Sequence, residues 1–332
     1  MILKFLCAFL VAFIFGTIIS PLVLYLCKKL KAKQTILFYV SEHETKNGTP
    51  TMGGIIFILT LFIVGIFFIN TDYLLSIISL VTTLCFAILG FLDDFLKIHY
   101  KQNLGLRAYQ KIIGQVGISL ILALFVYKSN IVGTKIFIPF SFDTIDLGIF
   151  IVPFVMFVFL AVVNSANLLD GLDGLCSGVS FVYILTFASI LLVYESEFFA
   201  RGLGEIKNIQ TLCFVMCGGL MSYFMFNCFP ASIFMGDTGS LALGGFIATI
   251  AVLTKLELYI PIIGFVYVIT ALSDVIQVMH YKRTKKRVFL MAPLHHHFQK
   301  KGVNENKIVA IYIIVTLVIC LTVLAILLKL GG

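Results

Sequence analysis

The chain has 332 residues, of which 60% are hydrophobic and only 12% are charged. Soluble domains carry about a quarter charged residues, so this composition excludes an ordinary soluble domain. The net charge of +8 comes without a basic face interleaved with aromatic residues, which argues against a nucleic-acid partner.

A helix needs about 20 apolar residues to cross the hydrocarbon core of a bilayer. Ten apolar runs fit this requirement, at approximately 2–27, 52–69, 73–92, 110–127, 149–167, 175–194, 209–227, 240–254, 258–279 and 308–328. The run at 240–254 is short and would need local thinning of the bilayer. The first run has a single Lys4 ahead of it and no small-residue cleavage site, so we expect a retained span rather than a signal peptide. The sequence therefore predicts an all-α polytopic bundle of ten transmembrane helices, forming one integral-membrane domain over residues 1–332.

The eight cysteines lie mostly in or beside the apolar runs. Cys213 and Cys217 are one helical turn apart, but no second pair completes a metal-binding set. We expect buried thiols that pack as small hydrophobic groups.

Basic residues predict the orientation. The linkers after the first, third and ninth runs, with their flanks, hold most of the 24 lysines and arginines. Cytoplasmic loops carry such an excess, so these linkers are predicted to be cytoplasmic and both termini external. Anionic lipid headgroups are the expected partners of this charge.

Polar and glycine-rich segments follow every odd-numbered run. In chain order they are Lys46–Gly54, Asp93–Lys97, Asn164–Gly174, Asn227–Gly245 and Pro293–Phe298. The linkers after the even runs lack this pattern, and the one at 128–148 is predicted to form a short external hairpin or helix. The chemistry is therefore expected on the cytoplasmic face alone.

Asp237 lies in a polar break between two apolar runs, and a charge so close to hydrocarbon usually marks a functional site. Gly236 and Gly239 flank it and would let backbone amides approach a ligand closely. Four more acids share its face: Asp93, Asp94, Asp170 and Asp173. Five acids would repel one another unless a cation or protons neutralised them. A divalent metal bound to a phosphorylated ligand is the simplest answer, so we predict a Mg²⁺ at Asp237 that binds a diphosphate.

Some of these acids have simpler interpretations. Asp93 and Asp94 point about 100° apart on a helix, so they cannot face one metal in the same way. A simpler interpretation is that Asp93 and Asp94 only end the helix at the level of the lipid headgroups. Negative charge at a helix C-terminus opposes the helix dipole, which weakens this interpretation. Asp170 and Asp173 are three residues apart, with Asn167 three residues earlier, and a helix-cap role remains an alternative.

Three consecutive histidines, His295, His296 and His297, have two interpretations. Zinc binding is one, but adjacent histidines splay and no further zinc motif supports it. Contact with phosphate oxygens suits imidazoles near pH 7 better. Asp274, within the ninth run, is expected either to pair with a basic residue of the last loop or to line a cavity.

Five motifs carry a resemblance to a known family: GTPTMGG (48–54), GFLDDFLK (90–97), NLLDGLDGL (167–175), FMGDTGSLALGG (234–245) and MAPLHHHF (291–298). In order and spacing they resemble the phospho-N-acetylmuramoyl-pentapeptide transferase family, within the superfamily of polyprenyl-phosphate N-acetylhexosamine-1-phosphate transferases. The resemblance covers about residues 46–300.

The resemblance implies ten transmembrane helices in the bacterial inner membrane, external termini and a cytoplasmic active site. It implies transfer of phospho-MurNAc-pentapeptide from UDP to undecaprenyl phosphate, giving lipid I and UMP in peptidoglycan synthesis, with Mg²⁺ as cofactor. The oligomeric state is left open, with a homodimer among the options.

The resemblance also assigns site residues. Asp237 matches the Mg²⁺ ligand, Asp93 and Asp94 match the catalytic pair, and His296 joins them as a catalytic residue between His295 and His297. The residues that resemble the substrate pocket are Lys46, Thr51, Asn167, Asp170, Gly171, Asp173, Asn227, Phe234, His295 and His297. The chain departs from the family pattern at Thr270, where a Glu is common, and at Gln299, where an acid is common.

Two mechanisms and two rival functions follow. We favour direct attack of the lipid phosphate on the diphosphate, and a two-step route through an aspartyl-phosphate is the alternative. A GlcNAc-1-phosphate transferase would use the same acids with a different sugar loop. An ion-coupled transporter would place its acids near the midplane, with repeat symmetry that this chain lacks.

Overall fold

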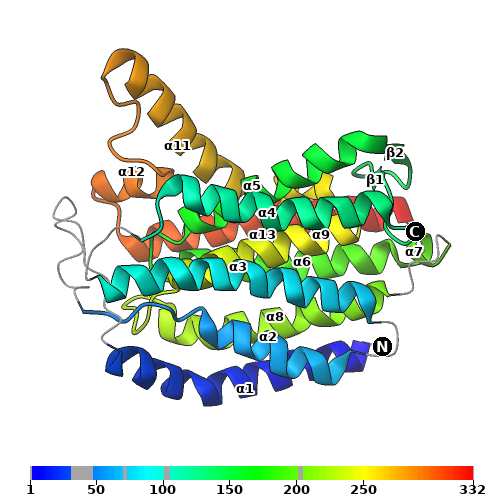
Figure 1. The fold of residues 1–332 in the computed structure, drawn as a ribbon, viewed down its shortest axis with the longest axis horizontal. Helices are drawn as coiled ribbons and strands as arrows, with labels where there is room; N and C mark the ends of the chain where they lie inside the picture. The colour runs from blue at the N-terminus through cyan, green and yellow to red at the C-terminus, as the bar shows by residue number, and fades with distance from the viewer. Residues whose placement is uncertain (1, 31–47, 70–72, 101–104, 201–204, 332) are drawn as a thin grey trace.

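In the computed structural model of the chain, residues 2–30, 48–69, 73–100, 105–200 and 205–331 are described (Figure 1). The helices are α1 (Ile2–Lys29), α2 (Ile55–Phe68), α3 (Leu74–His99), α4 (Ala108–Lys128), α5 (Ile151–Leu169), α6 (Leu175–Val193), α7 (Glu195–Ala200), α8 (Ile206–Asn227), α9 (Gly236–Leu253), α10 (Ile260–Ile263), α11 (Phe265–Thr284), α12 (Leu294–Lys300) and α13 (Glu305–Gly331). Two 3₁₀ turns, η2 (Gly148–Phe150) and η3 (Glu257–Tyr259), precede α5 and α10. The strands β1 (Lys135–Phe137) and β2 (Thr144–Asp146) pair antiparallel, with Ile136 opposite Ile145.

The prediction of an all-α polytopic membrane protein is confirmed. Within the described ranges, eight helices are long and apolar enough to span a bilayer, and nine if one bent pair counts as a single span. The remaining predicted run corresponds to α2, an apolar helix of only 14 residues, so ten is an approximate count. A helix rises 1.5 Å per residue, so α2 covers about 21 Å of a hydrocarbon core of about 30 Å.

The predicted single helix at 258–279 is wrong. The segments Glu257–Ile263 and Phe265–Thr284 meet at an angle of 81°. Gly264, between them, has φ −93° and ψ 26°, outside the helical range, and Pro261 precedes it by three residues. As a result α11 leaves the bundle and extends away from the other helices (Figure 1).

Helix α9 forms the centre of the bundle and is the most buried of the long helices that the structure describes. It packs against α3 on one side and α5 on the other. Gly90 of α3 touches the backbone of Asp237, where a Cβ atom would collide with the carbonyl carbon of Asp237 at 2.5 Å. Small residues allow helices to approach closely in membranes, where apolar side chains gain little from leaving lipid. The predicted short span at 240–254 is in fact longer, because the helix begins at Gly236.

The two termini lie at one end of the bundle, beside α7 and the β1–β2 hairpin (Figure 1). Of the hairpin or helix predicted at 128–148, the structure has the hairpin, and it rests on aromatic residues: Phe137 packs edge-on against Tyr194 and Phe198. The C-terminal end of α3 and helix α12 lie at the opposite end. The polar segments that follow the odd-numbered runs therefore gather away from the termini.

Candidate active site

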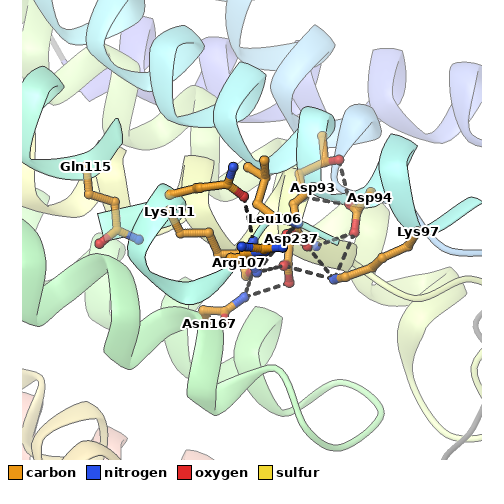
Figure 2. A network of polar contacts seen from close by, with 12 residues as sticks. Asp93, Asp94, Lys97, Leu106, Arg107, Lys111, Gln115, Asn167 and Asp237 are labelled. Carbon is orange, nitrogen blue, oxygen red and sulfur yellow. Dashed lines mark hydrogen bonds and ion pairs between the residues drawn. The ribbon is translucent and has the colours of Figure 1, made fainter. Parts of the chain in front are cut away.

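Three carboxylates meet where the end of α3 faces the start of α9 (Figure 2). Oxygen atoms of Asp93, Asp94 and Asp237 lie within 4.8 Å of one another. Asp93 is fully buried and Asp94 is 2% exposed, while the side chain of Asp237 is 15% exposed. Asp237 is therefore the member that a ligand reaches most easily.

Asp94 holds the first turn of α9. Its two oxygens accept hydrogen bonds from the backbone N–H groups of Asp237 (3.1 Å) and Thr238 (2.8 Å) and from the Thr238 hydroxyl (2.7 Å). The first N–H groups of a helix have no partner within the helix, and its positive end favours a carboxylate. Gly236 makes this approach possible, because its φ is +72° and a Cβ there would lie 2.6 Å from Asp94 Oδ2.

Asp93 points in a different direction, as expected for adjacent residues on a helix. Its Oδ1 accepts a hydrogen bond of 2.7 Å from the backbone N–H of Leu106. The sequence placed both acids in a linker after residue 92, but α3 continues to His99. Both side chains are buried inside the protein and are not exposed to lipid headgroups or solvent.

Two lysines bridge the carboxylates, and neither was among the predicted site residues. Lys97 Nζ lies 2.5 Å from Asp93 Oδ2 and 3.0 Å from Asp237 Oδ2. Lys111 Nζ lies 3.1 Å from Asp93 Oδ1 and 2.5 Å from Asp237 Oδ2. The sequence could have indicated both lysines. Lys97 follows Asp93 by four residues on one helix, which is ion-pair spacing. Lys111 lies near the N-terminus of α4, where a cation needs a compensating acid.

Asn167, in the last turn of α5, is the predicted residue that reaches Asp237 directly. Its Nδ2 donates to Asp237 Oδ1 at 2.8 Å and to Ser240 Oγ at 2.9 Å. Asp170 follows in the turn between α5 and α6, so Asp170 and Asp173 do not share a helical turn. Burial raises the pKa of Asp170 to about 8, and the neighbouring charges of Asp237, Asp94 and Asp173 add to the effect.

A second group of predicted residues surrounds the segment between α8 and α9. Asp173 Oδ2 accepts from the backbone N–H of Ala231 at 3.0 Å. Asn227 accepts from the N–H of Gly174 and the hydroxyl of Ser177, and donates to the carbonyl of Ile233. Here these two side chains order the loops around them.

The segment around Thr51 pairs with the start of α9. The backbone N–H of Phe234 donates to the carbonyl of Pro50, and the N–H of Gly53 donates to the carbonyl of Phe234, each at 2.8 Å. This pairing brings the Thr51 hydroxyl close to Gly236, which Asp94 also approaches, and leaves Phe234 half-buried. Lys46 lies outside the described residues.

The three histidines, all on α12, have different surroundings. His295 is fully buried, and both of its ring nitrogens lack a hydrogen-bond partner among the described residues. It lies against Gly171, where a Cβ atom would collide with its Nε2, and burial together with the charge of His296 holds its pKa well below the usual range. His296 is half-buried, next to Gln299 and Gly171. His297 turns away, and its Nδ1 accepts from the N–H of Leu290.

Asp274 and Thr270 contribute little to this cluster. Among the described residues, Asp274 makes no ion pair with a basic residue of the last loop. Cavity lining thus remains the prediction for Asp274. Thr270 is buried and donates its hydroxyl to the carbonyl of Val266.

The donor set suits a hard divalent cation. Within the described ranges, Asp93, Asp94 and Asp237 are the only set of His, Cys, Asp or Glu ligand atoms close enough to share an ion. Oxygen ligands of this kind fit Mg²⁺, and the zinc interpretation of the three histidines finds no support. The described cysteines form no disulfide; Cys213 and Cys217 are buried as expected, whereas Cys7 is exposed and Cys85 and Cys228 are only partly buried.

Comparison with known proteins identifies the family. The profile described as glycosyl transferase family 4 matches residues 75–255, and signature 1 of phospho-N-acetylmuramoyl-pentapeptide-transferase matches residues 46–58. Proteins named phospho-N-acetylmuramoyl-pentapeptide-transferase are similar over nearly the whole chain. The one from Clostridium kluyveri is 42% identical over 96% of this chain and 98% of its own length. The one from Clostridioides difficile (strain 630) is 42% identical (93% and 94%), and the one from Thermoanaerobacter sp. (strain X514) is 44% identical (96% and 97%). The chain belongs to the phospho-N-acetylmuramoyl-pentapeptide-transferase family.

Proposed function

We propose that this protein transfers phospho-MurNAc-pentapeptide from UDP-MurNAc-pentapeptide to undecaprenyl phosphate, releasing UMP and forming lipid I. The observation that carries the proposal is the carboxylate cluster of Asp93, Asp94 and Asp237 in a chain of this family. Acids, lysines and amides at one end of a membrane bundle suit a charged diphosphate and a lipid phosphate better than a transported ion.

The reaction needs positioning more than proton transfer. The second pKa of a phosphate monoester is near 6, so the acceptor lipid phosphate is largely a dianion at pH 7. One of its oxygens attacks the β-phosphorus of the UDP-sugar and forms a new P–O bond. The bond from the β-phosphorus to the bridging oxygen breaks, and UMP leaves with that oxygen. Charge neutralisation and alignment then supply most of the catalysis.

We assign Asp237, with Asp93 beside it, as the residues that would hold Mg²⁺. When bound there, Mg²⁺ would neutralise negative charge on the diphosphate. Asp94 keeps the start of α9 in place, Asn167 orients Asp237, and Lys97 and Lys111 provide positive charge for phosphate oxygens.

The remaining roles are assigned to the residues around the cluster. His296 would steady phosphate oxygens, and Asp93 would orient the lipid phosphate. Asp93 Oδ1 accepts from the N–H of Leu106, and the lipid phosphate is already an anionic nucleophile, so we favour direct attack over an aspartyl-phosphate intermediate. We assign the uridine diphosphate and its sugar to Lys46, Thr51, Asn167, Asp170, Gly171, Asp173, Asn227, Phe234, His295 and His297.

We further propose that the carboxylate end faces the cytoplasm and that both termini are external, in the inner membrane. Lysines and arginines concentrate on the segments of the carboxylate end, such as Lys282–Arg287 and Lys300–Lys301. The positive-inside bias supports this orientation. A nucleotide substrate is then supplied from the compartment where nucleotides are made.

A UMP-release assay tests this function. Purified protein receives undecaprenyl phosphate with either UDP-MurNAc-pentapeptide or UDP-GlcNAc, in Mg²⁺ or in EDTA. We expect UMP only with UDP-MurNAc-pentapeptide and Mg²⁺, because the lysines alone leave the diphosphate incompletely neutralised. Turnover of UDP-GlcNAc instead would favour the GlcNAc-1-phosphate transferase, and full turnover in EDTA would overturn the Mg²⁺ assignment.

A further inference from the structure

Lys97 and Lys111 bridge the same two carboxylates. Each ammonium group lies within 3.1 Å of one oxygen of Asp93 and one oxygen of Asp237 (Figure 2). These are contacts at ion-pair distance inside the protein, where opposite charges attract more strongly than in water. The protein's own cations therefore sit where Asp93 and Asp237 face each other.

The two lysines offset most of the charge of the cluster. The three carboxylates carry a charge of −3 and the two ammonium groups carry a charge of +2. The cluster therefore has a net charge of −1. A divalent cation binds to such a site less strongly than to three unpaired carboxylates, because part of its attraction is already satisfied. An ammonium group and a metal ion on the same carboxylate also repel each other, because both are positively charged.

The lysines are more exposed than the acids that they bridge. The side chains of Lys97 and Lys111 are 31% and 23% exposed, and a lysine has a long flexible stem. Asp93 is fully buried, and Asp94 is anchored to the first turn of α9. A diphosphate entering beside Asp237 offers the ammonium groups new anionic partners within reach of their stems.

We propose that Lys97 and Lys111 pair with Asp93 and Asp237 in the free protein and pair with the diphosphate when the nucleotide binds. In the free protein they compete with the divalent cation for Asp93 and Asp237. When a diphosphate arrives they move onto its oxygens and release the carboxylates to the metal. Metal and diphosphate then bind together, and by linkage each raises the affinity of the other by the same factor. This inference rests on the proposed function, because it requires a nucleoside diphosphate and a divalent cation at this site.

The test measures Mn²⁺ binding by the electron paramagnetic resonance signal of free Mn²⁺, with and without UDP. The signal is corrected for the Mn–UDP complex measured without protein. Lys111→Met keeps the stem and removes the charge. Arg107→Met is the matched control, since it removes a positive charge one helical turn away that makes no ion pair with the cluster among the described residues. Tyrosine fluorescence during heating checks that each variant is folded.

We expect Lys111→Met to bind Mn²⁺ at least about tenfold more tightly than Arg107→Met without UDP, since one competing charge is gone. UDP should raise the Mn²⁺ affinity of wild type clearly more than that of Lys111→Met. Equal Mn²⁺ affinity in Lys111→Met and Arg107→Met, or an unchanged effect of UDP, would overturn the inference. If Lys111→Met does not fold, Lys97→Met carries the same expectations.

The outcome is separable from that of the proposed function. If wild type is active but Lys111→Met gains no Mn²⁺ affinity, the inference is refuted and the proposed function is not affected. A wild type that shows the exchange with UDP and Mn²⁺ but releases no UMP removes the function instead.

Discussion

Asp93 and Asp94 are neighbours in sequence, yet they perform different tasks. Asp94 accepts hydrogen bonds from the start of α9, whereas Asp93 faces Lys97, Lys111 and the N–H of Leu106. The 100° between successive helical residues explains the division, and the sequence predicted that they would differ. The particular partners were not predictable, because Thr238 is 144 residues from Asp94 along the chain.

Asp170 should make stability depend on pH. Its folded-state pKa of about 8 lies well above the value of about 3.9 expected in the unfolded chain. Between these values the folded protein holds a proton that the unfolded chain releases, so the free energy of unfolding falls as pH rises from about 4 to about 8 and levels off above that.

The expected loss between pH 6 and pH 8 is of the order of 1–3 kcal/mol. Thermal unfolding followed by the fluorescence of the 13 tyrosines, in a chain without Trp, measures it. Asp170→Asn should flatten this part of the profile, while Asp146→Asn, a change at the opposite end of the bundle, should keep the wild-type slope. His295 and His296 lie near this turn, but they are present in wild type and in both variants. They therefore do not account for a difference in slope between these proteins. Equal slopes in wild type and Asp170→Asn would refute the assignment.

At the scale of elements, a pair of amides joins α4 to α5 just beyond the site. Asn164 Nδ2 donates to Gln115 Oε1 at 2.7 Å, and Gln115 Nε2 donates to Asn164 Oδ1 at 3.3 Å. Gln115 is fully buried and one helical turn from Lys111, and Asn164 is three residues from Asn167. The pair therefore fixes the two helices that bring Lys111 and Asn167 to Asp237.

Gln115→Leu and Asn164→Leu should each destabilise the protein, because each leaves the partner amide buried without its hydrogen bond. The double variant places two apolar groups together and should cost less than the sum of the single changes, with a coupling of about 1 kcal/mol. Unfolding in SDS, followed by tyrosine fluorescence, gives the four free energies. Additive costs would show that the two amides do not act as a pair.

Element boundaries show what hydropathy captures and what it misses. The ten runs located the helices, because hydrocarbon demands long apolar segments. Hydropathy ended the third helix at its first acids, whereas the helix continues through Asp93 to His99, supported by the Asp93–Lys97 pair and by Phe95 stacked on Phe91 and His99. Likewise, hydropathy misses the 81° bend at Gly264 because it lies within an apolar run, although Pro261 and Gly264 are helix-breaking residues.

For the whole molecule, alternation of polar and apolar segments gave the right arrangement of the site. Acids that follow odd-numbered spans return to one end of a bundle, and Asp93, Asp94, Asp170 and Asp237 do come within electrostatic reach of one another. The lysines were harder to predict, because Lys111 and Asp237 are 126 residues apart and meet only through the packing of α3, α4, α5 and α9. The resemblance to the family supplied the reaction, which geometry alone does not specify.

The central claim is that carboxylates from separate helices act as one phosphoryl-transfer centre organised around Asp237. UMP release by Asp237→Asn measures it most directly, since this change removes one charge and preserves size. We expect turnover to fall at least about 100-fold, the scale of losing one strong electrostatic contact to the transition state, with unfolding behaviour close to wild type. Asp146→Asn, near the termini, should retain wild-type turnover. Near-normal UMP release by a folded Asp237→Asn protein would contradict the account.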